Sequence, residues 1–419
     1  MRKLVTLENG IDIVMEEMDA IRSVSFGIWV RNGSRNESQM ESGISHFIEH
    51  MMFKGTDRRT AKGIADEMDS VGGQMNAFTT KEYTCYYTRT LDSHLHIALD
   101  LLSDMFLCSK FDSEDIKKEC KVITEEIDMY EDTAEELVHD LLQRQVWIDN
   151  PIGYSVIGKK ETISAFTRDT FMNYVDTHYS PKNTVITMVG RFNADEMVEK
   201  IRQAFGGFTT SAHEMNLPKV IYTPSVSAKP KDIEQTHLCL CFPGIPFGDD
   251  RAFNLTVMNT MFGGGMSSRL FQKIREENGL AYSVYSYITP YTDTGLMTIY
   301  TGFNVTQAAD VIKLLFEVVN EFFTDRVTQV QLDKAREQLK SNFLLSLEST
   351  SSRMSSLGRS QLLLQRTMTD DEIVENLDAV TLDSLYDIAS LILDKEKASM
   401  CVLGRLGEWD YEDLFNKAR

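Results

Sequence analysis

The chain of 419 residues carries one order of predicted elements twice, and this repetition constrains its fold more than any other feature. The order is a strand, a helix that ends in glycine, two paired strands and then two helices. It recurs after roughly two hundred residues, and repetition at this size predicts two similarly folded halves. Strands combined with amphipathic helices favour an antiparallel sheet backed by helices in each half, which is an α+β fold.

The expected elements follow from hydrophobic periodicity and from glycine positions. Asn9-Gly10 marks a hairpin turn near the start of the chain. In the first half we expect strands at 11–15, 24–30, 75–79, 83–90 and 185–189, and helices at 62–71 and 93–106. In the second half we expect strands at 238–242, 281–289 and 295–301, and helices at 253–262, 305–323 and 328–347.

Residues 211–232 separate the two repeats. This stretch lacks periodicity and holds Pro218, Pro224 and Pro230, three of only eight prolines in the chain. Such composition is typical of a linker. We therefore predict an N-terminal half over 1–210, a linker over 211–232 and a C-terminal half over 233–419.

His46, Glu49 and His50 lie three and four positions apart, so a helix places all three side chains on one face. Two neutral imidazoles one turn apart can bind one Zn²⁺, and the carboxylate between them can reach a water on the metal. The order is the inverted form of the commoner His-Glu-x-x-His motif. The motif does not recur in the second half, which indicates a repeat that lost its metal site.

The residues around this motif predict a partly buried helix. Ile44, Phe47, Ile48, Met51 and Met52 are apolar, and unpaired ionisable groups are costly in such surroundings. A bound metal would satisfy both imidazoles and the carboxylate. Ser45 is the expected N-cap, and Lys54-Gly55 the expected helix end. A chance match on a surface helix is the alternative explanation of the motif alone.

A hydrolytic zinc site needs a third protein ligand and an open position for water. A second predicted helix opens at Ser113, its expected N-cap, and carries Glu119 and Glu126 two turns apart beside its apolar face. Glu125 lies further round, on the solvent side. Glu126 is therefore the better candidate of the adjacent pair, although a solvated helix residue is the usual state of any single glutamate.

With these motifs, the chain resembles the pitrilysin and mitochondrial processing peptidase family of zinc peptidases, the inverzincins, over almost its full length. In the first half the resemblance rests on Gly33-Ser34-Arg35 with Glu37, on residues 43–56, 72–79 and 119–127, and on Glu82-Tyr83-Thr84. In the second half it rests on residues 263–271 and 275–284. The glycines at 263–265 lack the Gly-Lys-Ser/Thr ending of a P-loop, so we do not expect a nucleotide site.

The resemblance implies a zinc endopeptidase with one Zn²⁺ per chain. It implies that His46, His50 and Glu126 ligate the zinc and that Glu119 supports the site from behind. Glu49 would be the general base that takes a proton from zinc-bound water and passes it to the leaving amine.

The resemblance also implies how a substrate is held. Asn76, Ala77 and Phe78 would pair with the peptide as an added β-strand. Arg275 and Tyr282, from the C-terminal half, would project towards the site and orient the substrate. The two halves would close like a clamshell around oligopeptides or unfolded segments, and chains of this length in the family usually pair, here as a homodimer.

Composition excludes several partners. The formal net charge is −20, which argues against nucleic acid and anionic membrane surfaces. We expect no signal peptide and no membrane-spanning segment. The six cysteines are scattered, as in a protein of a reducing compartment, and a bacterial cytoplasm is the expected location.

Two alternatives to a peptidase stay open from the sequence. The first is a non-catalytic scaffold or partner subunit, since the resembled family includes members that have lost the motif. The second is a peptide-binding module that keeps zinc for structure, although structural zinc sites usually have four protein ligands.

Overall fold

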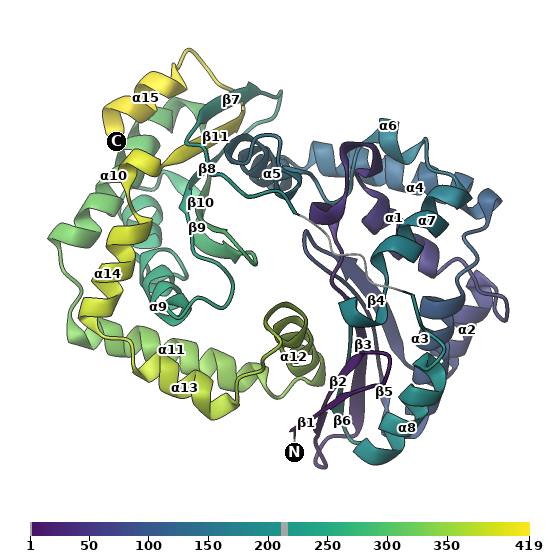
Figure 1. The fold of residues 1–419 in the computed structure, drawn as a ribbon. Coiled ribbons are helices and arrows are strands. Elements are labelled where there is room, and N and C mark those ends of the chain that lie inside the picture. The colour runs from purple at the N-terminus through teal and green to yellow at the C-terminus, as the bar shows by residue number, and fades with distance from the viewer. Residues whose placement is uncertain (1, 211–216) are drawn as a thin grey trace. The chain divides into compact units, whose positions relative to one another are not determined.

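The computed structural model describes residues 2–210 and 217–419, and the chain divides into two compact units (Figure 1). Unit 1 comprises Met1–Asp128, Tyr154–Pro218 and Ser346–Thr367, and unit 2 comprises Met129–Gly153, Lys219–Leu345 and Met368–Arg419. Each unit contains one sheet with helices packed against it. Part of the predicted linker, residues 211–216, lies outside the described residues.

The sheet of unit 1 has six strands in the order β1-β2-β6-β3-β5-β4. Their bounds are β1 (Arg2–Thr6), β2 (Asp12–Glu17), β3 (Ser23–Val30), β4 (Gln74–Thr79), β5 (Thr84–Leu91) and β6 (Thr184–Gly190). β3 is buried along nearly its whole length, as expected of an apolar central strand covered on both faces. β4 forms one edge of the described sheet and pairs with β5.

Eight helices of unit 1 surround this sheet in the described part of the chain. They are α1 (Ile44–Met52), α2 (Ala61–Ser70), α3 (Leu95–Cys108), α4 (Ser113–Asp132, whose last residues are assigned to unit 2), α6 (Lys160–Ile163), α7 (Arg168–His178), α8 (Ala194–Phe205) and α12 (Thr350–Leu364). Apolar side chains of α1 and α4, among them Phe47, Ile48 and Ile123, enter one buried cluster with the strands. This shared core fixes α1 and α4 in one unit.

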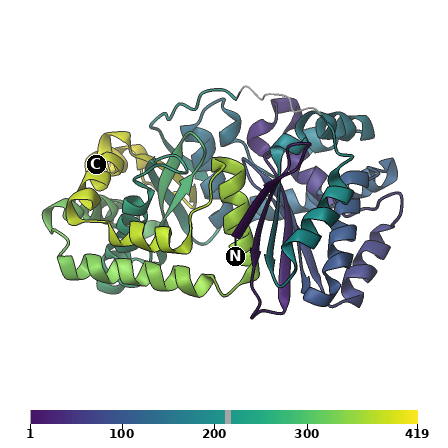
Figure 2. The same ribbon diagram turned by 60° about the horizontal axis from the view of Figure 1, so that its bottom comes forward.

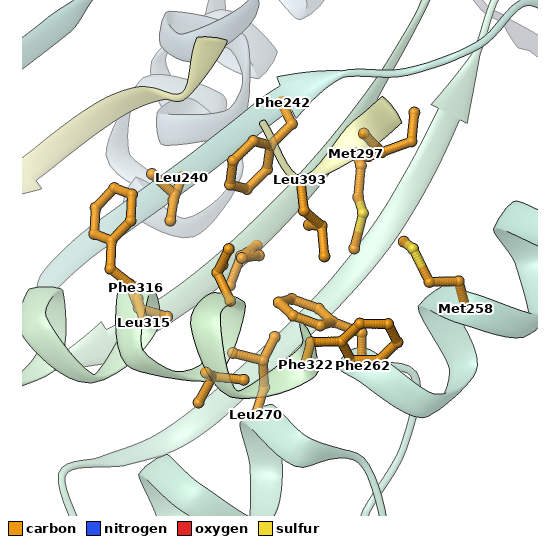
Figure 3. Packing of buried hydrophobic residues seen from close by; sticks show 14 of the residues in the cluster. Leu240, Phe242, Met258, Phe262, Leu270, Met297, Leu315, Phe316, Phe322 and Leu393 are labelled. Atoms are coloured by element: carbon orange, nitrogen blue, oxygen red, sulfur yellow. The ribbon is translucent and has the colours of Figure 1, made fainter. Parts of the chain in front are cut away.

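The sheet of unit 2 has five strands in the order β7-β11-β8-β10-β9. Their bounds are β7 (Val226–Pro230), β8 (Thr236–Pro243), β9 (Ala281–Pro290), β10 (Gly295–Phe303) and β11 (Ser399–Gly404). Its helices are α5 (Ala134–Val146), α9 (Ala252–Phe262), a π-helical segment (Phe271–Glu277), α10 (Ala308–Thr324), α11 (Gln329–Ser346), α13 (Asp370–Asp378), α14 (Leu382–Ile392) and α15 (Tyr411–Ala418). Phe242, Phe262 and Phe322 belong to its main core, in which the rings of Phe262 and Phe322 lie side by side (Figure 3).

The predicted duplication is confirmed by the strand orders. β2 to β6 and β7 to β11 occupy matching positions, so each half contributes five strands with the same connections. The sheets are not purely antiparallel, because β2 pairs in parallel with β6 and β7 with β11. β7 lies inside the predicted linker, so part of that stretch is a strand. The prolines argued against a strand there, but an edge strand such as β7 tolerates proline.

One helix from each half of the sequence packs on the sheet whose strands come from the other half. α5 follows α4 in the chain but contacts β8 and β11 of unit 2. α12 follows α11 but lies along β3 and β6 of unit 1, as both ribbon views show (Figures 1 and 2). The units therefore differ from a division of the chain at residues 211–232.

The packing of α12 explains how a helix so distant in sequence is held. Gly358 lies directly against the indole of Trp29, which is buried and donates from Nε1 to Thr187 Oγ1 at 2.8 Å. Ser25 Oγ and Thr350 Oγ1 lie 2.9 Å apart, and Arg353 pairs with Glu16. Because a Cβ at Gly358 would overlap the ring, only glycine permits this approach.

Gly358→Ala should therefore destabilise unit 1. A Cβ at Gly358 would lie 2.2 Å from the Trp29 ring, so overpacking should cost about 2–3 kcal/mol, and the gain in helix propensity of about 1 kcal/mol offsets only part of this cost. We expect a net loss of roughly 1–2 kcal/mol in the free energy of unfolding, measured by urea denaturation.

Gly207→Ala is the matched control, since its added Cβ meets open space. Its effect should stay within about 0.5 kcal/mol. An unchanged stability of Gly358→Ala would contradict the close packing of α12 on Trp29.

Candidate metal centre

The helix that carries the histidines, α1, is capped by a buried carboxylate. Glu37 accepts the backbone N–H groups of Gly43 at 2.7 Å and Ser45 at 2.9 Å. These are donors that the first turn of a helix leaves unpaired. Burial raises the pKa of Glu37 to about 7, against these hydrogen bonds. The expectation that Ser45 is the N-cap is wrong, because Ser45 lies inside the helix and Gly43, with φ of 93°, precedes it.

The same segment fixes the turn between β4 and β5. Arg35 pairs with Glu82 at 2.5 Å, and both side chains are almost fully buried. The backbone N–H of Arg35 donates to the carbonyl of Lys81 at 2.8 Å. Residues 33–37 therefore fix both the start of α1 and the turn at the end of β4.

The loop after α1 is held to α3 by ion pairs and a hydrogen bond to one aspartate. Asp104, only 4% exposed, accepts from Thr56 Oγ1 at 2.7 Å, from Arg58 Nε at 2.9 Å and from Arg59 Nη1 at 2.8 Å. Burial alone would raise the pKa of Asp104, but these hydrogen bonds and the arginine charges lower it below the ordinary carboxyl value. The loop is thus fixed through one ionised carboxylate.

His46, His50 and Glu126 converge in unit 1. His46 Nε2 lies 3.7 Å from Glu126 Oε1, and His50 Nε2 lies 3.6 Å from Glu126 Oε2. One ligand atom of each residue lies within 4.8 Å of the other two. Ligand atoms bound to a tetrahedral zinc lie roughly 3.3 Å apart, so this group needs only a small contraction to enclose one ion.

The electrostatics of the two imidazoles differ. Burial, with a smaller contribution from His50, lowers the pKa of His46 to about 4, so this ring is neutral at pH 7. Burial opposes charge on His50 too, but its hydrogen bond to Glu119 and the nearby carboxylates raise its pKa. Neutral imidazole is the form that ligates a metal, and a cation between the rings would supply the positive charge that the carboxylates favour.

Glu119 lies behind His50. Its Oε1 is 2.9 Å from His50 Nδ1, and its Oε2 is 2.5 Å from Lys54 Nζ. A carboxylate on one imidazole nitrogen fixes the tautomer and leaves Nε2 free for a metal, the usual arrangement behind a histidine ligand. Burial raises and the contacts with His50 and Lys54 lower the pKa of Glu119, with a net decrease.

Glu49 lies on the same helix face without joining the ligand group. Its Oε2 accepts from Thr79 Oγ1 at 2.5 Å. Burial raises the pKa of Glu49, which the Thr79 hydrogen bond opposes. A partly desolvated carboxylate beside a metal site is suited to accept a proton near neutral pH.

Helix α4 supplies Glu119 and Glu126. Its first turn is capped by Asp112, whose Oδ1 accepts from the N–H of Glu114 at 2.8 Å, rather than by the predicted Ser113. The Glu125 side chain is exposed, as its position on the helix predicted, whereas Glu126 is partly buried. Helical periodicity therefore distinguished two adjacent glutamates.

The other predicted site residues lie in β4 of unit 1 and in unit 2. Asn76, Ala77 and Phe78 lie in edge strand β4, with Asn76 exposed and Ala77 buried. In unit 2, the Arg275 guanidinium lies 4.4 Å from the ring centroid of Tyr282 and 4.7 Å from that of Phe271. Arg275 and Tyr282 thus form a pair, and the action of this pair on a substrate stays a prediction.

Two protein-family models match this chain. Residues 12–160 match the family model described as Insulinase (Peptidase family M16), and residues 165–339 match that described as Peptidase M16 inactive domain. The chain belongs to peptidase family M16. The first match spans the histidines and Glu126, and the second covers much of the repeat that lacks them.

Two relatives match this M16 chain over most of its length. It is 42% identical over 398 residues to an uncharacterized zinc protease of Bacillus subtilis, covering 95% of this chain and 97% of the relative. It is 37% identical over 409 residues to an uncharacterized zinc protease of Streptomyces coelicolor, covering 96% and 89%.

Two solved structures share the fold. A protease from Helicobacter pylori aligns with a TM-score of 0.89 at 20% identity over 96% of this chain and 99% of its own. A peptidase M16 inactive domain from Pseudomonas fluorescens aligns with a TM-score of 0.90 at 18% identity, over 96% of this chain and 98% of its own. The predicted two-domain fold of this family is thus confirmed. None of the helices among the described residues combines the length and apolar character needed to cross a membrane.

The ionised Asp104 predicts a stability that depends on pH. Since its folded-state pKa is lowered, its contribution is present above the pKa of the unfolded chain and is lost as pH falls through the folded value. Asp104→Asn should cost about 2–4 kcal/mol at pH 7 and flatten the loss of unfolding free energy below pH 5.

Asp100→Asn is the control, because Asp100 binds the same arginines but is half exposed. Its effect should stay below about 1 kcal/mol. Equal effects of the two substitutions, measured by urea denaturation across pH, would contradict a special role of Asp104.

Proposed function

We propose that this M16 chain is a zinc-dependent endopeptidase that hydrolyses oligopeptides or unfolded segments. The observation that carries the proposal is the convergence of His46, His50 and Glu126, with Glu49 on the same face of α1. Relatives named zinc proteases support it.

The residues present fit one Zn²⁺. Two imidazole nitrogens and a carboxylate oxygen are the donor set of hydrolytic zinc sites, which keep a fourth position open. In the described part of the chain, the group that could hold a metal consists of these three residues. A structural site would need a fourth protein ligand, so the three-residue group favours catalysis over a purely structural zinc.

The roles of the side chains follow from their positions. When bound, Zn²⁺ would polarise the scissile carbonyl and lower the pKa of water. Glu49 would accept a proton from the attacking water and deliver it to the leaving nitrogen. Glu119 would hold His50 in the tautomer that presents Nε2, and Lys54 would balance the charge of Glu119.

Substrate binding is proposed at the edge of β4. The backbone there has no neighbouring strand in the described sheet, so an extended peptide could pair along Asn76, Ala77 and Phe78. Pairing of this kind needs an unfolded segment, which excludes folded proteins as direct substrates. Arg275 and Tyr282 are proposed to contact the substrate from unit 2.

A non-catalytic partner subunit is the second candidate. The description of the second matching family model as inactive is the observation that favours it. That match, over residues 165–339, contains none of His46, His50 and Glu126, whereas the first match, over residues 12–160, contains all three. We therefore prefer the peptidase.

The test is cleavage of a quenched fluorogenic peptide library by the purified, zinc-loaded chain. Glu49→Gln should reduce turnover by more than about a thousandfold while zinc content stays at one per chain, because this change removes the base and leaves the three ligands. Glu126→Gln should lower both turnover and zinc content, because it removes a ligand.

Glu125→Gln is the matched control, since it makes the same change one residue away on the exposed side of α4. Its turnover and zinc content should equal those of the unaltered chain. Zinc binding without cleavage of any peptide would instead support the partner subunit.

We also propose that the chain works as a homodimer in a bacterial cytoplasm. All six cysteines are free, which is consistent with a reducing compartment. Sedimentation of the purified chain should give twice the monomer mass, and a monomer at micromolar concentration would contradict the dimer.

A further inference from the structure

The partner of Glu49 comes from the strand proposed to bind the substrate. Thr79 is the last residue of β4, and its Oγ1 donates to Glu49 Oε2 at 2.5 Å. This contact connects the proposed general base on α1 with the proposed peptide-binding edge of β4.

The hydroxyl proton of Thr79 is directed to Glu49 by its surroundings. A threonine hydroxyl has one proton to donate. The neighbouring hydroxyls use theirs elsewhere: Thr80 Oγ1 donates to the carbonyl of Tyr83 at 2.8 Å, and Thr84 Oγ1 to that of Asn32 at 2.9 Å. Thr84 Oγ1 also lies 3.4 Å from Thr79 Oγ1, but this contact is far longer than the 2.5 Å contact with Glu49, and a carboxylate is the stronger acceptor, so the Thr79 proton goes to Glu49.

Thr79 is held rigidly in place. It pairs with Thr84 across the β4–β5 ladder, and the turn that follows it is fixed by the buried Arg35–Glu82 pair. The N–H of Thr80 donates to the carbonyl of Tyr83 at 2.8 Å and closes that turn. A donor on such a support can hold a carboxylate in one orientation.

The alternation of β4 places Thr79 on the side of α1. Met75 and Ala77 pack into the cluster that contains α1, and Phe78 packs into the separate cluster that contains α12. Thr79, two positions after Ala77, shares its face. The strand thus offers its free edge to a peptide while one of its side chains holds the base.

We propose that Thr79 is a positioning residue that fixes the Glu49 carboxylate, with Oε2 occupied and Oε1 left to accept the proton of the attacking water. The inference rests on the proposed function. In the reaction the water proton moves to Glu49 Oε1 and then to the leaving nitrogen, and Thr79 keeps its own proton throughout.

Two substitutions separate the hydroxyl from the shape of the side chain. Thr79→Val keeps the branched shape and removes the donor, whereas Thr79→Ser keeps the donor. Thr88→Val is the matched control: it makes the same change on neighbouring β5, where the buried Thr88 Oγ1 has no hydrogen-bond partner among the described residues.

We expect Thr79→Val to lower kcat by about 10- to 100-fold with KM changed less than about threefold, the usual effect of losing a supporting hydrogen bond. Thr79→Ser should restore kcat to within about threefold of the unaltered chain. Zinc content, and the thermal midpoint relative to Thr88→Val, should not change. A general structural defect would lower these as well and would not be rescued by serine.

A Thr79→Val enzyme with unaltered kcat, beside an active unaltered chain, would overturn this inference and leave the peptidase in place. Equal losses in Thr79→Val and Thr79→Ser would also overturn it. An unaltered chain that holds zinc and cleaves no peptide would overturn the proposed function and with it the inference, so the two failures are distinguishable.

Discussion

The candidate site depends on three carboxylates gathered around two imidazoles. Glu49, Glu119 and Glu126 all raise the pKa of His50, so their charges act on one another as well. Partly buried like charges are unfavourable unless a cation lies among them. Lys54 compensates the negative charge of one of the three carboxylates, Glu119, with which it forms an ion pair. A divalent metal between His46, His50 and Glu126 would compensate the charges of the other two carboxylates. This requirement for positive charge connects the geometry to the proposed zinc chemistry.

The scaffold fixes this arrangement through short polar links rather than through the sheet alone. Glu37 holds the start of α1, and Arg35 holds the turn after β4, so one five-residue segment positions both the histidine helix and Thr79. Asp104 holds the loop after α1 from the other end. Arg35, Glu37 and Glu82, which lie outside the histidine motif, are thus among the residues that position it.

Local patterns predicted what local physics decides. Helical spacing placed His46, Glu49 and His50 on one face and chose Glu126 over Glu125. The duplicated strand order followed from periodicity in the same way. Sequence did not predict that α5 and α12 pack in opposite units, because periodicity shows that a helix has an apolar face but not which sheet covers it. The parallel pairs of β2 with β6 and β7 with β11 join distant segments and left no local signal. Glu37 was missed as a cap because its donors lie six and eight residues away.

The most direct measurement of the central claim is X-ray absorption at the zinc K-edge of the purified chain loaded with one equivalent of zinc. The account predicts two imidazole nitrogens and one carboxylate from the protein, no sulfur ligand, and loss of one imidazole in His46→Ala. A zinc bound by sulfur, or a spectrum unchanged by His46→Ala, would contradict a metal held by His46, His50 and Glu126.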